Sequence, residues 1–188
     1  MRHTLLLLAA AAPTIAAAQA DLRIAPSGRA SSQVAIAPPR VEGQPDAVPL
    51  LIKIDYGQPH ARGRKVAGAI DTDQGKVWRL GANEATSLRT DVDLLIGGAT
   101  VPKGLYTLFA ETTPNAWRLI VNKRTGPQGL EYVAADDVAK IPLKSRALAS
   151  PIESLTMWLI PAGDSTLKGE LRIAWGTLEH SVDWSVKP

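Results

Sequence analysis

Apolar and polar residues alternate along much of the chain from residue 50 onward, with the period of two that is typical of half-buried β-strands. Residues 167–175 are the clearest example, because Leu, Gly, Leu, Ile and Trp alternate there with Lys, Glu and Arg. Residues 178–186 repeat the pattern after a break at Gly176 and Thr177. We therefore expect both segments to be strands with one apolar face.

Short alternating runs are separated by Gly, Pro, Asn and Asp, and no window of helical length shows a convincing helical period. This pattern predicts an all-β fold: a single antiparallel β-sandwich, jelly-roll-like or Greek-key, with about 8–10 short strands and little helix. Residues 92–96, 106–111 and 117–122 are separated by short turns, which suggests an antiparallel meander.

The first twenty residues have the features of a secretory signal peptide. Arg2 supplies the positive start, residues 5–12 the apolar run, and residues 18–20 an Ala-Gln-Ala cleavage site. We expect residues 1–20 to be removed and the mature chain to begin at Asp21, in the periplasm or outside the cell. No later apolar run approaches the roughly 20 residues of a membrane span, so we expect a soluble product without stable membrane insertion.

Residues 21–47 are rich in Pro, Ala and Ser and contain few large apolar side chains. Such a composition favours a flexible arm, in which residues 34–37 could form a short strand along a sheet edge. The β-sandwich domain is expected over residues 48–188. The chain has no cysteine, so neither disulfides nor a lipidated cysteine can stabilise or anchor it.

The formal net charge is +3 at pH 7, and basic residues are spread among acidic ones. This small excess does not indicate a nucleic-acid partner. His60 and His180 are the only histidines after the signal peptide, and neither has a closely spaced ligand partner. We therefore expect no metal and no cofactor. His180 lies beside the Gly176 break, where a partly exposed histidine at a strand end is the ordinary interpretation.

Residues 75–88 hold the densest set of side chains that could bind a ligand: Trp78, Arg79, Asn83, Glu84 and Thr86. A carboxylate, a guanidinium and an amide near an indole would suit a polar or sugar-like molecule. The alternative is structural, with Arg79 and Glu84 paired to hold a bulge at Gly81.

A hydrolase is a further alternative, with Glu84 as acid or base and Arg79 as electrostatic support. Glycoside hydrolysis would need a second carboxylate close to Glu84. The candidates for that carboxylate are Asp55, Glu111, Glu153 and Asp183.

Tryptophan is more frequent than phenylalanine in this chain, with five residues against one. Trp117, Trp175 and Trp184 share strand faces with aliphatic residues and are expected in the core. Trp78 and Trp158 are the remaining candidates for an exposed indole, which could offer a flat face to a sugar ring.

Six segments of the chain match the motifs of a known family. The most specific are Lys-Val-Trp-Arg-Leu-Gly-Ala-Asn-Glu-Ala-Thr at 76–86 and Val-Pro-Lys-Gly-Leu-Tyr-Thr-Leu-Phe at 101–109. The others are 63–64, 117–123, 153–156 and 171–175. On these residues the chain resembles the bacterial family called domain of unknown function 2911. The resemblance implies a secreted β-rich domain and brings no activity, cofactor or catalytic residue. The turn at 71–75 departs from the family's usual apolar turn.

We favour a non-catalytic binding module for a small polar ligand, a glycan or an envelope protein over an enzyme. The alternatives are the hydrolase and a structural or interaction module. A concave pocket that holds Glu84 beside a second titratable group would favour the enzyme, whereas a flat apolar patch would favour a protein partner.

Overall fold

A computed structural model describes residues 22–70, 75–113, 116–126, 130–163 and 167–188. The predicted signal peptide and most of the unusual turn at 71–75 lie outside these residues.

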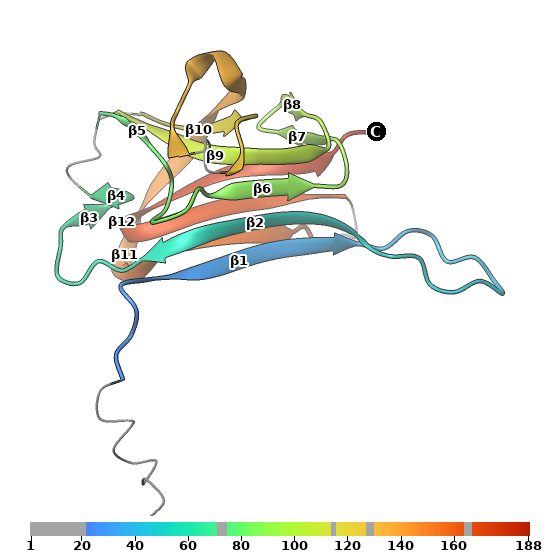
Figure 1. Cartoon of the computed structure of the whole chain (residues 1–188), viewed down its shortest axis with the longest axis horizontal. Coiled ribbons are helices and arrows are strands. Elements are labelled where there is room, and N and C mark those ends of the chain that lie inside the picture. Colours follow the sequence, from blue (N-terminus) through green and yellow to red (C-terminus); the bar gives the residue numbers. More distant parts are fainter. Residues whose placement is uncertain (1–21, 71–74, 114–115, 127–129, 164–166) are drawn as a thin grey trace, which may run out of the picture.

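Strands dominate the described chain, and the predicted all-β fold is confirmed (Figure 1). A 3-10 turn at Ala134–Asp136 directly precedes the strand that begins at Asp137. The strands are β1 (Ser27–Ile36), β2 (Leu50–Pro59), β3 (Val66–Ala67), β4 (Ala69–Ile70), β5 (Val77–Trp78), β6 (Ser87–Thr90), β7 (Leu94–Ile96), β8 (Ala99–Val101), β9 (Gly104–Thr113), β10 (Ala116–Asn122), β11 (Asp137–Pro161) and β12 (Lys168–Val186).

The strands form one antiparallel sheet in the order β1-β2-β6-β9-β10-β11-β12-β3-β4. β5 pairs with β9, while β7 pairs with both β12 and β8. The two longest strands bend, β11 at register shifts between Ala147 and Thr156 and β12 at Gly176, where φ is 61°. β11 and β12 therefore pass behind β2 and β6 in Figure 1. The sheet folds over on itself, and the core lies between these two layers.

Side chains of β1 and β2 close the gap between these strands and the second half of β11. The resulting seam consists of three hydrogen bonds. Gln58 Nε2 donates to the Leu155 carbonyl (2.9 Å), the Met157 amide donates to the Tyr56 hydroxyl (3.1 Å), and the Leu159 amide donates to Ser32 Oγ (2.9 Å). Buried backbone groups need such partners, so the seam replaces part of a strand ladder.

The predicted core tryptophans, Trp117, Trp175 and Trp184, are all buried, as expected from the faces they share with aliphatic residues. Trp78, a candidate for an exposed indole, is buried, because only 6% of its surface is accessible. Its indole stacks on that of Trp175, with ring centroids 5.9 Å apart. Trp158 is half-buried. The burial of Trp78 therefore depends on stacking against β12, a strand far away in sequence.

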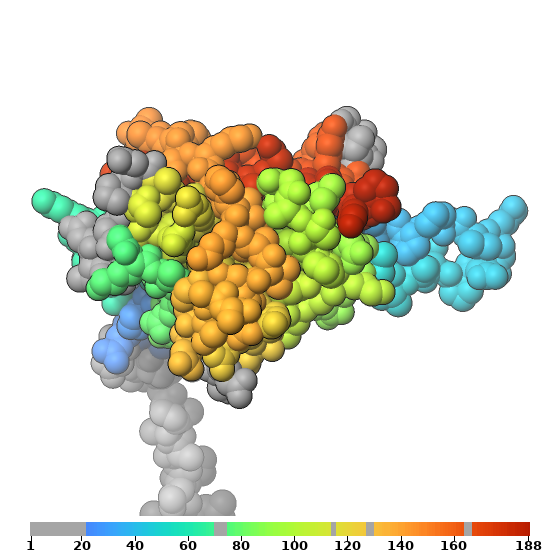
Figure 2. Space-filling model, turned by 90° about the horizontal axis from the view of Figure 1, so that it is seen from above, coloured from blue at the N-terminus to red at the C-terminus, as the bar shows by residue number. Residues whose placement is uncertain are grey.

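The prediction of a flexible arm over residues 21–47 is wrong for Ser27–Ile36. These ten residues form β1, which pairs with β2 along its whole length at the sheet edge. The edge position expected for residues 34–37 is confirmed for Val34–Ile36, but the strand is longer. Residues 37–49 then stand out from the body of the molecule (Figure 2), where Arg40 Nε and Asp46 bind at 2.9 Å.

The predicted three-strand meander is also only partly correct. β9 and β10 form the expected hairpin, with Leu119 opposite Ala110. β7 turns instead into β8 and pairs on its other side with the end of β12, where Ile96 lies opposite Trp184. Alternation predicts which residues form a strand but not its partner, and here the contact with the distant β12 decides the pairing.

Candidate functional site

The loop of residues 79–86 connects β5 with β6 and contains most of the predicted site residues. Leu80 and Asn83 have positive φ angles of 51° and 60°. Non-glycine residues seldom adopt this conformation, so contacts with the surrounding structure must hold it. One of them is internal to the loop: the buried Thr86 hydroxyl donates to the Leu80 carbonyl at 2.8 Å. Thr86, predicted to bind a ligand, thus closes the loop.

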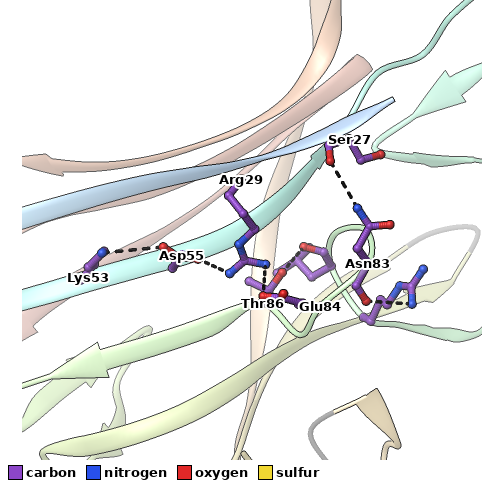
Figure 3. Close-up of polar contacts among 9 residues, drawn as sticks. Ser27, Arg29, Lys53, Asp55, Asn83, Glu84 and Thr86 are labelled. Atoms are coloured by element: carbon purple, nitrogen blue, oxygen red, sulfur yellow. Dashed lines mark hydrogen bonds and ion pairs between the residues drawn. The ribbon is translucent and has the colours of Figure 1, made fainter. Parts of the chain in front are cut away.

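β1 and β2 hold this loop from the other side. The Ala82 amide donates to the Gly57 carbonyl at 3.2 Å, and Asn83 Nδ2 donates to the Ser27 carbonyl at 3.3 Å (Figure 3). A Cβ atom on Gly57 would lie 1.8 Å from the Ala82 carbonyl oxygen, so only glycine permits this approach. The position of Asn83 is therefore determined by two strands that are distant in sequence.

The loop forms one wall of a hollow of about 630 Å³, which we call the arginine cavity. Segments from both ends and the middle of the chain meet there. Six of its lining residues matter for its chemistry: Arg64, Trp78, Arg79, Asn83, Tyr132 and Trp175. Three of the five predicted site residues, Trp78, Arg79 and Asn83, are thus brought together.

Arg64 lines the cavity but was not among the predicted site residues. Its Nε donates to the Ala61 carbonyl at 3.0 Å and its Nη2 to the His60 carbonyl at 2.6 Å. The guanidinium also lies 5.9 Å from the centre of the Trp175 ring. Two bonds and a cation–π contact hold it in place. The sequence signal for Arg64 was its place in the family segment at 63–64.

Arg79 and Asn83 belong to the loop of residues 79–86, whereas Arg64 precedes β3. All three line the same cavity. Arg79 is exposed, and its Nη1 donates to the Asn83 carbonyl at 3.3 Å. The stacked indoles of Trp78 and Trp175 give the cavity an apolar wall between polar groups.

Glu84 lies outside the arginine cavity. Its side chain is 80% exposed and lies 3.7 Å from Arg29, whose guanidinium also binds Asp55 (Figure 3). The expected pair of Arg79 with Glu84 is not formed among the described residues, because Arg79 turns toward the loop backbone. Glu84 and Asp55 both pair with Arg29, so the two carboxylates share one cation.

Tyr132 completes the cavity from the segment before β11. Its hydroxyl donates to Asp137 at 2.7 Å, and its ring packs edge-on against Phe109 with centroids 5.3 Å apart. Burial, together with the bond to Asp137, raises the pKa of Tyr132 above its usual value. The phenol is therefore neutral at physiological pH and adds no negative charge to the cavity.

The histidines lie apart from one another. His180 is 1% exposed, against the prediction of a partly exposed strand end, and stacks on Trp117 at 4.1 Å. Its Nδ1 contacts Ser145 Oγ at 2.8 Å, while Nε2 has no partner among the described residues. Burial lowers the pKa of His180 to about 4. His60 Nδ1 contacts Ser154 Oγ at 2.7 Å.

Within the described residues there is no group of three or more His, Cys, Asp or Glu side chains arranged to hold a metal ion. Nor does that part of the chain contain a helix long and apolar enough to cross a membrane. Comparisons with curated proteins and with solved structures gave no match. A family model described as a protein of unknown function matches residues 42–184, so the chain belongs to the DUF2911 family.

Proposed function

We propose that this protein is an exported, non-catalytic binding domain that holds a small polar molecule, such as a glycan unit, in the arginine cavity. The observation that carries the proposal is the convergence of Arg64, Arg79 and Asn83 on one hollow of about 630 Å³. Pockets for small molecules typically enclose about 300–1,000 Å³ and present a few fixed polar groups. A concave site of this kind fits a small ligand better than a flat protein surface.

The position of Glu84 supports binding over hydrolysis. A general acid or base acts best where water is excluded and its protonation is tuned by burial. Glu84 is largely exposed, and its neighbour is the cation Arg29. It lines a different hollow, together with Tyr106 and Leu130.

A thermal-shift screen of residues 21–188 against sugars, amino acids and other small polar metabolites tests the proposal. A ligand at about 100 times its Kd stabilises the native state by about 2.7 kcal/mol, which raises the melting temperature. We expect Arg79→Ala to lose this shift while melting close to the wild type, because Arg79 is exposed.

Glu84→Gln is the matched control, since it changes an exposed side chain on the same loop outside the cavity. It should keep the full ligand shift. Loss of binding in Glu84→Gln with retention in Arg79→Ala would contradict the proposed site and revive the hydrolase.

A further inference from the structure

The two arginines of the arginine cavity differ from most described arginines in having no ion pair. Most described arginines lie within 4.0 Å of a carboxylate: Arg29, Arg40, Arg89, Arg118, Arg124, Arg146 and Arg172. Arg64 and Arg79, which both line the cavity, have no such ion pair with any described residue. Their positive charges therefore have no counter-charge within 4.0 Å among the residues that the structure describes.

The cavity wall does not supply one either. Among its described lining residues there is no Asp or Glu. Tyr132 remains a neutral phenol because burial raises its pKa. Two guanidinium groups that face a hollow with no Asp or Glu among its described lining residues favour a positive potential there, and a concave surface concentrates that potential.

Arg64 is also held in place before any ligand arrives. Its bonds to the Ala61 and His60 carbonyls use Nε and Nη2, which leaves Nη1 without a partner among the described residues. Arg79 uses Nη1 for the Asn83 carbonyl, and its Nε and Nη2 have no partner among the described residues. Both side chains thus have donors left, and the ordering cost for Arg64 is already met by the protein fold.

We propose that the ligand of the arginine cavity carries an oxyanion, a carboxylate or a phosphate, which binds between Arg64 and Arg79. The planar guanidinium presents paired N–H donors that match both oxyanions. The stacked indoles and Tyr132 would contact the rest of the molecule, since the hollow is larger than an inorganic ion requires. This inference rests on the proposed function and narrows its ligand class.

Calorimetric titration tests the inference. The protein is residues 21–188, and the probes are three sugars of similar shape together with inorganic phosphate. The probes are D-glucose, D-glucuronate, glucose 6-phosphate and inorganic phosphate at low ionic strength. We expect at least one acidic sugar to bind about tenfold or more tightly than glucose, the gain from one charge-assisted hydrogen bond. Comparing the affinity of D-glucuronate with that of glucose 6-phosphate shows whether the cavity prefers a carboxylate or a phosphate. Binding of inorganic phosphate as tightly as glucose 6-phosphate would show that the rest of the molecule is not recognised, and would overturn the inference.

Arg64→Gln and Arg79→Gln should each weaken the acidic probe about tenfold or more, and added salt should do the same. Arg62→Gln is the matched control, because Arg62 is an exposed neighbour that binds the Ile24 carbonyl and does not line the cavity. It should bind like the wild type. Melting curves of all three variants separate lost binding from lost folding.

Equal binding of glucose and both acidic sugars, or unchanged affinity in both cavity variants, would overturn the inference and leave the proposed function standing. A screen ligand that is neutral and binds in the cavity would do the same. If no probe and no screened compound binds the domain, both the inference and the proposed function fail.

Discussion

At the scale of single residues, His180 is the side chain whose environment differs most from its ordinary one. It is buried against Trp117, and its pKa falls from 6.5 to about 4. The neutral imidazole is favoured because burial penalises the charged form more than neighbouring Glu179 stabilises it.

This burial predicts a pH-dependent stability. Between pH 6.5 and 4 the unfolded chain binds a proton at His180 that the native protein does not, so stability falls as the pH is lowered. The loss at pH 4 should be about 3 kcal/mol relative to pH 7. Denaturant unfolding of wild type and His180→Gln at both pH values measures it, because the variant lacks this contribution.

His60→Gln serves as the control for that comparison. His60 is half-buried and bound to Ser154, so its replacement should leave the His180-dependent difference in place. If wild type and His180→Gln lost the same stability on acidification, His180 would not be the group responsible.

At the scale of elements, the seam between β2 and β11 makes a separate prediction. Tyr56→Phe removes the acceptor of the Met157 amide, and both residues are buried away from solvent. An unsatisfied buried donor costs about 1–3 kcal/mol in unfolding free energy. Chemical denaturation of the variant should show this loss with an unchanged m-value.

Tyr106→Phe is the comparison variant for the seam. It removes a bond to the carbonyl of Pro102, an exposed residue that water can reach. We expect a loss below that of Tyr56→Phe. Equal losses would mean that the seam contributes no more than an ordinary tyrosine bond.

β1 makes the second prediction at this scale. Removing residues 21–26 from the mature chain should change stability little, whereas removing residues 21–36 deletes β1 and its Ser32 bond to Leu159. The longer truncation uncovers the edge of β2, which can then pair with other chains. Denaturation midpoints and size-exclusion profiles compare the two, and identical behaviour would show that β1 is dispensable.

At the scale of the whole molecule, the proposed export predicts where the mature chain begins. Expressed in a bacterium with its own first twenty residues, the chain should be recovered from the envelope or the medium with Asp21 as its N-terminus. Intact-mass analysis measures this. Replacing Leu6 and Leu7 by Asp interrupts the apolar run and should leave the uncleaved chain inside the cell. Cleavage of that variant would contradict the proposal.

The whole molecule also explains why the predicted site was only partly brought together. Arg79 and Asn83 reach the arginine cavity because the 79–86 loop lies on Gly57 of β2. Glu84, their neighbour in sequence, turns to Arg29 on β1 instead. Proximity along the chain kept these side chains on one loop, but the flanking strands decided which way each one faces.

The sequence alone determined the all-β class, the family, and the burial of Trp117, Trp175 and Trp184. These features follow from local alternation and local motifs, which a single segment carries. Tertiary structure decided the rest: that Arg64 joins Arg79, that Trp78 and His180 are buried, and that β7 pairs with β12. Each of these depends on contacts between strands far apart in sequence, whose partners no local period specifies.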